Sequence, residues 1–388
     1  MTEGVDEAAL PQLRVAGVAL RGSGYPNAIN TLRHLRNAGV RIEDQADWLP
    51  EGLHLWKALR GSFNGKLALY ARLVLGNAWA AWRLCRWTGR ERLTTYVPYP
   101  AVFLLWWISW VPKKWRPPLI ADAYISIWDS AVRDRALVGR GRWSDRLLKI
   151  FEARALRAAD AVLVDTVANR EWMIREFGLV PESVFAIPLA IDDQQLLRLA
   201  PSVPGYPLRV SFIGTFVPLH GIGILMDSVR RTADPERVLF HFVGDGQDAV
   251  KVEEVVASGL PGFTWERGWY SHEQIIEHVE RSDVCLGVFG GAAKASRVLP
   301  FKLYLALAAG RAVVTQRDFS LPEGVPAPPF LTVAADPEQI ASLLRTLGED
   351  PGLCSSMGQA GRDFYREWLG ERALLKAWGH LFANVTDT

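Results

Sequence analysis

The sequence contains little cysteine and no long hydrophobic run. Its three cysteines, Cys85, Cys285 and Cys354, form no CxxC pair and no Cys/His cluster with metal-ligand spacing. A disulfide framework and a structural zinc site are therefore not supported, and the composition favours a reducing cytoplasm. The apolar stretch 102–111 is too short to cross a bilayer, which requires about 20 residues. The first eleven residues are acidic and polar, so we expect no secretory signal.

Negative charge is scarce in one region. Residues 54–158 contain 19 Lys and Arg against 6 Asp and Glu, although the whole chain has a net charge of only +2. Tryptophans lie among these cations, including Trp82, Trp87, Trp106, Trp107, Trp110 and Trp115. Such a block indicates a polyanion or an anionic membrane surface as partner. A buried helix with snorkelling arginines is the structural alternative, and nucleic acid is not expected because no recognised module is visible.

Strand-like and helix-like segments alternate along the chain. We expect strands at 13–20, 118–124, 161–165, 184–188, 208–214, 238–243, 263–266, 284–289 and 312–316. We expect helices at 27–37, 64–89, 142–158, 167–177, 222–231, 302–309 and 357–384. This alternation predicts an α/β fold with two doubly wound, Rossmann-like domains that face a cleft. The Pro-rich stretch 201–207 divides the chain into 1–205 and 206–388, with the final helix packing back on the first domain.

The strongest motif for chemistry spans residues 290–310. A loop of small residues follows an apolar strand, and Pro300 stands where a helix would begin. Backbone N–H groups and the positive end of that helix would then meet Lys294, Arg297 and Lys302. This combination predicts an anion site suited to a diphosphate. Solvated cations on an ordinary surface loop are the alternative.

A second strand end, at residues 211–222, leads through glycine into a helix. Gly214 lets a phosphate approach the backbone closely, and Thr215 follows it. Taken alone, the turn is weak evidence because parallel sheets use glycine there for tight turns. His220 is either a ligand or a cap of the following helix.

Together, these segments resemble the nucleotide-sugar domain of GT-B glycosyltransferases, especially retaining glycosyltransferase family 4 and its relatives. The resemblance is strongest over residues 206–320. Gly214-Thr215 and His220-Gly221 match the family's phosphate loop, and residues 242–246 with Gly244 match its VGxG strand end. Residues 267–270 with Trp269 match its base-contacting loop, and Pro300 with Lys302 matches its P-x-K helix.

The chain departs from the family at its E-x7-E pair, which falls on Arg297 and Leu305. Leu305 cannot accept a hydrogen bond from the ribose. The resemblance therefore implies a diphosphate clamp that is kept and a ribose contact that is relocated or mediated by water. In the first domain, it places the loop with Ser23 and Gly24 near the donor phosphates, with a glycine-rich tight turn as the alternative.

The resemblance also suggests catalytic candidates in the first domain. Segment 118–129 is similar to a strand end where relatives carry a D-x-H-D sequence, with Tyr124 at the place of the histidine. Asp122 is the first candidate, and Asp129 the second, for orienting the acceptor hydroxyl or stabilising positive charge at the anomeric carbon. Pairing of either carboxylate with a nearby arginine is the structural alternative.

The resemblance implies a retaining, metal-independent hexosyltransferase without a cofactor. Cations and helix N-termini would neutralise the leaving diphosphate. The donor would be a nucleoside-diphosphate sugar, and the acceptor a glycan or a polyprenyl-phosphate-linked sugar in bacterial surface polysaccharide synthesis. We expect the protein in the cytoplasm, peripheral on the inner membrane. The alternatives are a nucleotide-sugar epimerase or hydrolase of the same fold, and a catalytically silent membrane-associated partner of a glycan synthase.

Overall fold

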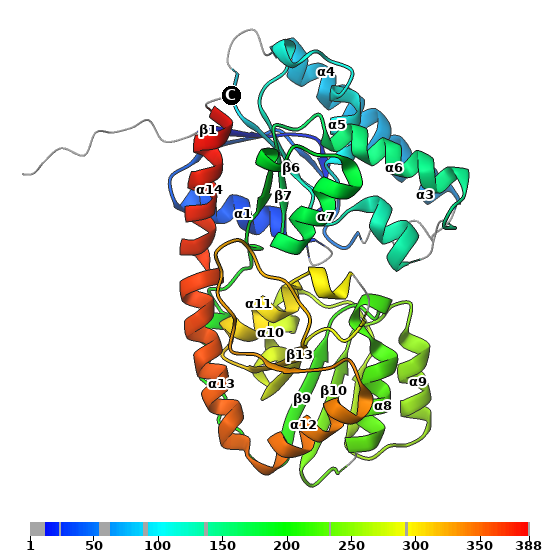
Figure 1. Ribbon diagram of the computed structural model, residues 1–388, viewed down its shortest axis with the longest axis vertical. Helices are drawn as coiled ribbons and strands as arrows, with labels where there is room; N and C mark the ends of the chain where they lie inside the picture. The colour runs from blue at the N-terminus through cyan, green and yellow to red at the C-terminus, as the bar shows by residue number, and fades with distance from the viewer. Residues whose placement is uncertain are drawn as a thin grey trace, which may run out of the picture.

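The computed structural model describes residues 12–22, 25–53, 63–87, 92–135, 139–232, 234–291 and 294–386. They form two α/β domains that follow one another along the long axis of the molecule (Figure 1). Each domain is built on a six-stranded parallel sheet, as the sequence predicts. Ser23 and Gly24, expected near the donor phosphates, lie outside the described residues.

The N-terminal sheet has the strand order β3-β1-β5-β6-β7-β8. Its strands are β1 (Gln12–Val15), β3 (Arg41–Asp44), β5 (Thr95–Val97), β6 (Leu119–Asp122), β7 (Ala161–Val164) and β8 (Val184–Ala186). The central strands β6 and β7 are buried along their full length, which explains why their sequences are largely apolar. The sequence did not predict β3, because it is an exposed edge strand without apolar alternation, or β5, which has only three residues.

The expected strand 13–20 is interrupted in the structure. Gly17 has a φ of 103°, a conformation that residues with a Cβ rarely adopt. The chain bends there, and β2 (Val18–Ala19) leaves the main sheet to pair with β4 (Asp47–Trp48).

The helices of the N-terminal domain are α1 (Asn27–Asn37), α3 (Phe63–Ala71), α4 (Asn77–Trp87), α5 (Val102–Ile108), α6 (Trp143–Leu156) and α7 (Val167–Phe177). The expected helix 64–89 corresponds to α3 and α4, joined by the π-helical turn η1 (Arg72–Gly76). Helix α7 starts at Thr166, whose side chain accepts a hydrogen bond from the N–H of Asn169, and ends at the left-handed Gly178. Among the described residues, no helix is both long and apolar enough to cross a membrane.

The C-terminal sheet has the order β11-β10-β9-β12-β13-β14. Its strands are β9 (Leu208–Ile213), β10 (Val238–Val243), β11 (Phe263–Glu266), β12 (Val284–Leu286), β13 (Ala312–Gln316) and β14 (Leu331–Val333). Its helices are α8 (Ile222–Thr232), α9 (Ala249–Ala257), α10 (His272–Glu280), α11 (Phe301–Ala308), α12 (Pro337–Glu349) and α13 (Pro351–Phe364). Strands β10, β11 and β13 have the bounds that the sequence predicts. β10 and β13 are largely apolar runs, and β11 alternates apolar and polar residues.

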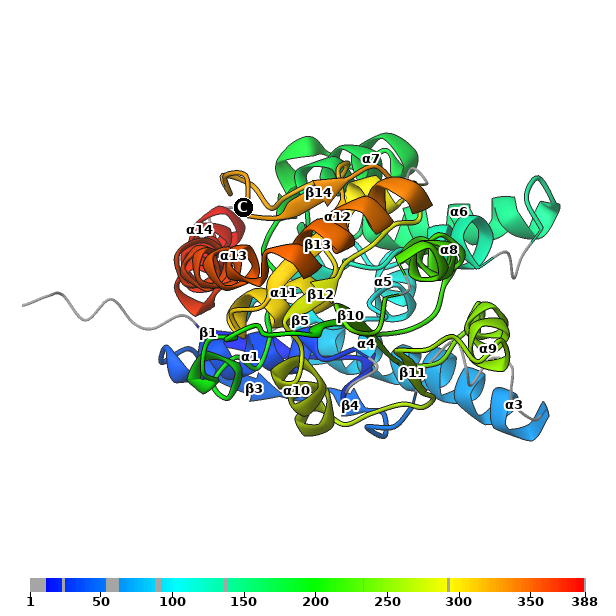
Figure 2. The ribbon, with the colours of Figure 1, turned by 90° about the horizontal axis from the view of Figure 1, so that it is seen from below.

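The last helix, α14 (Glu371–Thr386), returns to the N-terminal domain (Figures 1 and 2). It follows α13 through the π-helical turn η8 (Tyr365–Leu369). Trp378 is 1% exposed and meets the ring of Tyr96 edge-on, with 5.5 Å between the centroids. Leu374, Trp378 and Leu381 belong to the same buried cluster as residues of β1 and α1. The chain therefore crosses between the domains twice, after β8 and again near η8.

Candidate functional site

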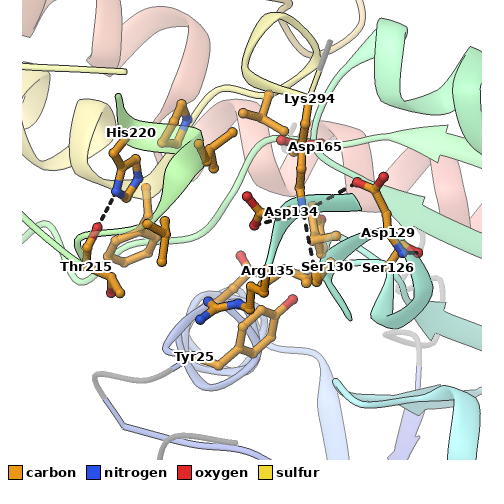
Figure 3. A pocket seen from close by; sticks show the side chains of 18 of the residues that line it. Tyr25, Ser126, Asp129, Ser130, Asp134, Arg135, Asp165, Thr215, His220 and Lys294 are labelled. Carbon is orange, nitrogen blue, oxygen red and sulfur yellow. Dashed lines mark hydrogen bonds and ion pairs between the residues drawn. The ribbon is translucent and has the colours of Figure 1, made fainter. Parts of the chain in front are cut away.

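A cavity of about 590 Å³ lies between the two domains. Loops that follow the parallel strands of both sheets line it, which is where ligands of such sheets bind. Figure 3 shows the side chains that project into it. The predicted site residues that line it are Tyr124, Asp129, Thr215, His220, Trp269 and Lys294. The other predicted site residues within the described part of the chain are not part of this lining.

Lys294 connects the two domains across the cavity. It lies in the loop after β12 and reaches η3, the turn Asp129–Asp134 of the N-terminal domain. Its Nζ donates to Ser130 Oγ at 3.1 Å and lies 3.4 Å from Asp129 Oδ2 and from Asp134 Oδ2 (Figure 3). This side chain is 20% exposed, so the contacts form in a partly water-excluded place.

Arg297 shares the carboxylate of Asp129 with Lys294. Its Nη2 donates to Asp129 Oδ2 at 3.2 Å, and its guanidinium lies 4.0 Å from the ring centroid of Trp172. Thr166 donates its hydroxyl proton to the carbonyl of Arg297, which ties this loop to the start of α7. Arg297 was expected on the diphosphate, but here it lies behind the cavity wall, held by Asp129 and Trp172.

Lys302, the other residue of the predicted clamp, is also removed from the cavity. It follows the first residue of α11, as expected, but its ammonium lies 3.4 Å from the ring centroid of Phe212 and beneath the backbone of Gly214. Among the described residues, its Nζ has no hydrogen-bond partner. Burial lowers the pKa of Lys302 well below its usual value. The expectation that Lys302 contacts the ligand directly is therefore not met by this conformation.

The loop after β9 supplies polar groups without charge. The ring Nδ1 of His220 donates to the carbonyl of Thr215, and the side chain is 8% exposed. Burial and the nearby Lys302 lower the pKa of His220 well below its usual value, so the ring is neutral at pH 7. Gly214, with a φ of 147°, closes this turn against Lys302.

Asp122, the first catalytic candidate, lies beneath the cavity rather than in its wall. It ends β6, as predicted, but its carboxylate accepts hydrogen bonds from the hydroxyls of Tyr25 at 2.5 Å and Tyr96 at 2.8 Å. Burial raises the pKa of Asp122 to about 6, against the opposing effect of these two donors. Its contact with the cavity is indirect, through Tyr25, which does line it. In this structure Asp122 positions Tyr25, and its expected contact with substrate stays a prediction.

The structure adds functional candidates that the sequence did not single out. Asp165 follows β7, lines the cavity, and accepts from the backbone N–H of Leu299 in the opposite domain at 3.4 Å. Burial raises the pKa of Asp165 to about 6. Arg135 and Arg267 also line the cavity. A signal for Arg267 was present in the base-contacting loop 267–270, whereas nothing local marked Asp165 or Arg135.

Two backbone segments lie unusually close together where β10 and β11 end beside the cavity. A Cβ at Gly244 would lie 2.0 Å from the carbonyl oxygen of Gly214, so only glycine fits there. Arg267 Nε lies 3.3 Å from Asp245 Oδ2, and Trp269 lies beside them in the lining. Leu305 is 5% exposed and belongs to a buried apolar cluster, so it does not reach the cavity. The place of the family's ribose-binding acid is thus part of the core.

Most of the C-terminal domain matches a known family model. Residues 207–350 match the model described as glycosyl transferases group 1. A D-inositol 3-phosphate glycosyltransferase of Geodermatophilus obscurus is 25% identical over 183 residues, which cover 42% of this chain and 40% of the relative. The chain thus matches less than half the length of that protein.

Solved structures of the same fold cover nearly the whole chain. HepE of Anabaena, in complex with UDP-glucose, has a TM-score of 0.63 at 14% identity and covers 96% of this chain and 99% of its own. The lipopolysaccharide outer core galactosyltransferase WaaB, in its apo form, has a TM-score of 0.61 with the same identity and coverage. The predicted fold class is confirmed: the chain has the GT-B fold, and residues 207–350 of its C-terminal domain match the model of the group 1 glycosyltransferases.

Proposed function

We propose that the protein transfers a sugar from a nucleoside-diphosphate sugar to a glycan or lipid-linked acceptor. The interdomain cavity is the observation that carries this proposal. The family-matched domain contributes Thr215, Trp269 and Lys294 to one wall, and the N-terminal domain supplies the other. UDP is the nucleotide we favour, because the HepE structure of the same fold contains UDP-glucose.

In the proposed reaction, the bond between the anomeric carbon and the diphosphate breaks as the acceptor oxygen bonds to that carbon, and the proton of the acceptor hydroxyl passes to an oxygen of the leaving diphosphate. Charge develops on the leaving diphosphate, and donors already in place stabilise it. We assign this task to Lys294, which lines the cavity, and to Arg297, whose guanidinium would have to turn from its place behind the cavity wall. The two cations now share one carboxylate oxygen of Asp129. Phosphate oxygens would replace Asp129 as their partner, so the proposal requires no metal ion at the diphosphate.

The acceptor side of the proposal lies on the N-terminal wall. Tyr25, Tyr124 and Ser130 bring hydroxyl groups to the cavity. Asp122 fixes Tyr25 by accepting a hydrogen bond from its hydroxyl group. We propose retention of configuration at the anomeric carbon, on the resemblance to glycosyltransferase family 4, and a role in bacterial surface polysaccharide synthesis.

The outer helices of the N-terminal domain support attachment to an anionic membrane. Eight of their large apolar side chains are exposed and are here together called the aromatic face: Leu67, Tyr70, Leu75, Trp79, Trp82, Trp107, Trp110 and Trp115. The indole N–H of Trp107 donates to the carbonyl of Val74, so the segments around η1 and α5 lie side by side. Arg86 lies 5.0 Å from the Trp82 ring and Arg154 lies 3.7 Å from the Trp110 ring. Exposed aromatics with cations among them are suited to a lipid headgroup region, which would bring a lipid-linked acceptor to the cavity.

The test of the proposed function is a thermal-shift panel of UDP, GDP, dTDP, ADP and CDP. The proteins compared are the wild type, Lys294→Ala, and Lys251→Ala as a control at an exposed lysine of the same domain. Ligand at 100 times its dissociation constant stabilises a protein by about 2.7 kcal/mol. We expect UDP to stabilise the wild type and Lys251→Ala, and Lys294→Ala to bind UDP more weakly by about 1–3 kcal/mol.

Two outcomes would favour the alternatives instead. If no nucleotide stabilises the wild type, the catalytically silent partner becomes the better description. If the protein consumes a UDP-sugar at full rate without any acceptor, a hydrolase or epimerase of the same fold is the better description. Turnover that depends on an added glycan or polyprenyl-phosphate sugar supports the transferase.

A further inference from the structure

Three side chains at the edge of the C-terminal sheet converge on one point. His241 lies on β10, Glu266 is the last residue of β11, and His278 lies in the last turn of α10. Each offers one ligand atom, and these atoms all lie within 4.8 Å of one another. This cluster could not be predicted from the sequence, because its members are spread over 38 positions without a known metal-binding spacing.

The distances within the cluster are those of a small coordination sphere. His241 Nε2 lies 3.3 Å from Glu266 Oε1 and 3.3 Å from His278 Nδ1. A tetrahedral zinc ion has metal–ligand distances of about 2.0–2.1 Å, so the edges between its ligand atoms measure about 3.3–3.4 Å. Two edges of the cluster already have this length. The contact between His278 and Glu266 is 3.7 Å and uses the other ring nitrogen, Nε2, so the ring of His278 or the carboxylate would have to turn to complete the sphere.

A neighbouring hydroxyl orients the first histidine for metal binding. Thr264 Oγ1 donates its proton to the carbonyl of Phe240 at 3.2 Å, so it can only accept from the ring of His241. The Nδ1 of His241 lies 2.9 Å from that oxygen and therefore carries the proton. Nε2 is left with a lone pair directed at the carboxylate of Glu266 and the ring of His278. Metal-binding histidines are fixed in this way by a partner on the other ring nitrogen.

We propose that His241, Glu266 and His278 bind a divalent transition-metal ion, with Zn²⁺ as the best match. Two imidazoles and one carboxylate are ligands that zinc prefers. The side chain of His278 is 6% exposed and that of Glu266 is 47% exposed, so the site is anchored on the protein side and open on the other. A water molecule would complete the coordination there.

The position of this site suggests what the metal does. Glu266 ends β11, and the loop that follows carries Arg267 and Trp269 into the interdomain cavity before α10 begins. A metal held between β10, β11 and α10 would fix both ends of that loop. This consequence depends on the proposed nucleotide site, whereas metal binding itself does not.

The experiment measures metal on the full chain, freed of any histidine tag and of metal by a chelator. Zinc content after dialysis against Zn²⁺ gives the stoichiometry, and Co²⁺ substitution gives a visible absorption that reports nitrogen and oxygen ligands. We expect one metal ion per chain in the wild type. Glu266→Gln, a change at a half-exposed position, should weaken binding at least tenfold, and His241→Ala should abolish it.

The matched control is His380→Ala, at an exposed histidine of α14. It should keep the full stoichiometry. Absence of bound zinc in the wild type, or equal binding by the wild type and Glu266→Gln, would overturn the proposal. Because no nucleotide enters the measurement, its result is independent of whether the protein is a glycosyltransferase. If His241→Ala fails to fold, Glu266→Gln still decides the question.

Discussion

The two domains share a sheet architecture, yet around the cavity they bury titratable groups of opposite kind. The N-terminal domain buries acids, and burial raises the pKa of Asp122 to about 6, of Asp165 to about 6 and of Glu152 to about 7. Beside the cavity, the C-terminal domain buries bases, and burial lowers the pKa of His220 and of Lys302. In each group the charged form carries a cost of desolvation that the neutral form avoids.

This difference shows how the cavity obtains its polarity. Glu152 is held by three donors, the hydroxyl of Ser126 and the backbone N–H groups of Ile127 and Trp128. It thereby fixes the turn that leads into Asp129. The buried acids of the N-terminal domain thus position side chains on the cavity wall. The buried bases of the C-terminal domain lie beneath the loops that we expect to bind an anion. A reaction that separates an anionic leaving group from an acceptor hydroxyl is suited to this division.

The largest expected effect is on the stability of the protein and concerns α14, the helix that follows the C-terminal domain but packs on the N-terminal domain. Trp378 belongs to α14 but packs in the N-terminal core. Trp378→Ala should destabilise the protein by about 3–5 kcal/mol, because it removes a large buried side chain. Denaturant unfolding followed by fluorescence measures the change. Trp143→Ala, at a 75% exposed position of the N-terminal domain, is the control and should change stability by less than about 0.5 kcal/mol.

The second prediction uses pH to separate the domains. A carboxyl whose folded pKa is raised binds protons more tightly in the folded state, so its stability contribution is lost as pH rises from the unfolded to the folded value. For Glu152 that window runs from about 4.5 to about 7, and the loss is at most about 3 kcal/mol. A base whose folded pKa is lowered gives the opposite trend. Stability of the C-terminal domain should therefore rise over the window in which that of the N-terminal domain falls.

Tryptophan fluorescence can follow this pH dependence, because 12 of the 16 tryptophans precede residue 205. Unfolding at pH 5, 6, 7 and 8 should show the fluorescence-detected transition moving to lower denaturant as pH rises. Glu152→Gln should flatten the slope, whatever its effect on the absolute stability. A fluorescence transition that gains stability with pH in the wild type would contradict the assignment.

The third prediction tests whether the surfaces of the domains differ as their interiors do. Replacing Leu75 and Trp79 together by serine should weaken binding to anionic vesicles about tenfold, because both are exposed on the aromatic face. Val250 and Val256 are comparably exposed on the C-terminal domain, and their replacement by serine is the control. Vesicle sedimentation at low and high salt gives the readout. Equal losses of vesicle binding in the two double variants would show that the aromatic face is not the membrane-binding surface.

The smallest expected effect lies at the contact between the domains. Asp129 occupies Lys294 and Arg297, so Asp129→Asn should release both and tighten UDP binding about threefold. Asp134→Asn is the control, because Asp134 contacts Lys294, whereas Asp129 contacts both cations. Calorimetric titration with UDP distinguishes the two variants. Weaker binding by Asp129→Asn would mean that this carboxylate orients the cations rather than competing for them.

The sequence predicted the architecture well because its signals are local. The alternation of apolar strands and amphipathic helices reached the observed bounds at α1, α7, β10 and β13. The short or exposed strands β3, β5 and β14 carry no such signal, and three-dimensional pairing alone makes them strands.

The site was predicted less completely because side-chain partners lie far apart in the sequence. Asp122 ends a strand as expected, but Tyr25, 97 positions earlier, draws its carboxylate into the core. Arg297 stands in the expected loop, but Asp129, 168 positions earlier, holds it there. Lys302 occupies the expected first turn of α11, and the ring of Phe212 on β9 places its ammonium under a loop. Position along an element was therefore predictable, whereas the direction of each side chain was not.

The double crossing of the chain has a consequence for how the cavity opens. The first connection follows β8, and the second passes through η8, where Tyr365 donates its hydroxyl to Asp193 Oδ2 of the first connection at 2.9 Å. Two attachments that are bonded to each other act as a single hinge line. We expect such a line to favour rotation of the domains about it over sliding or twisting. An opening about this line would return Asp129 to the same pair of cations, so substrate exchange would not require the two walls to align again.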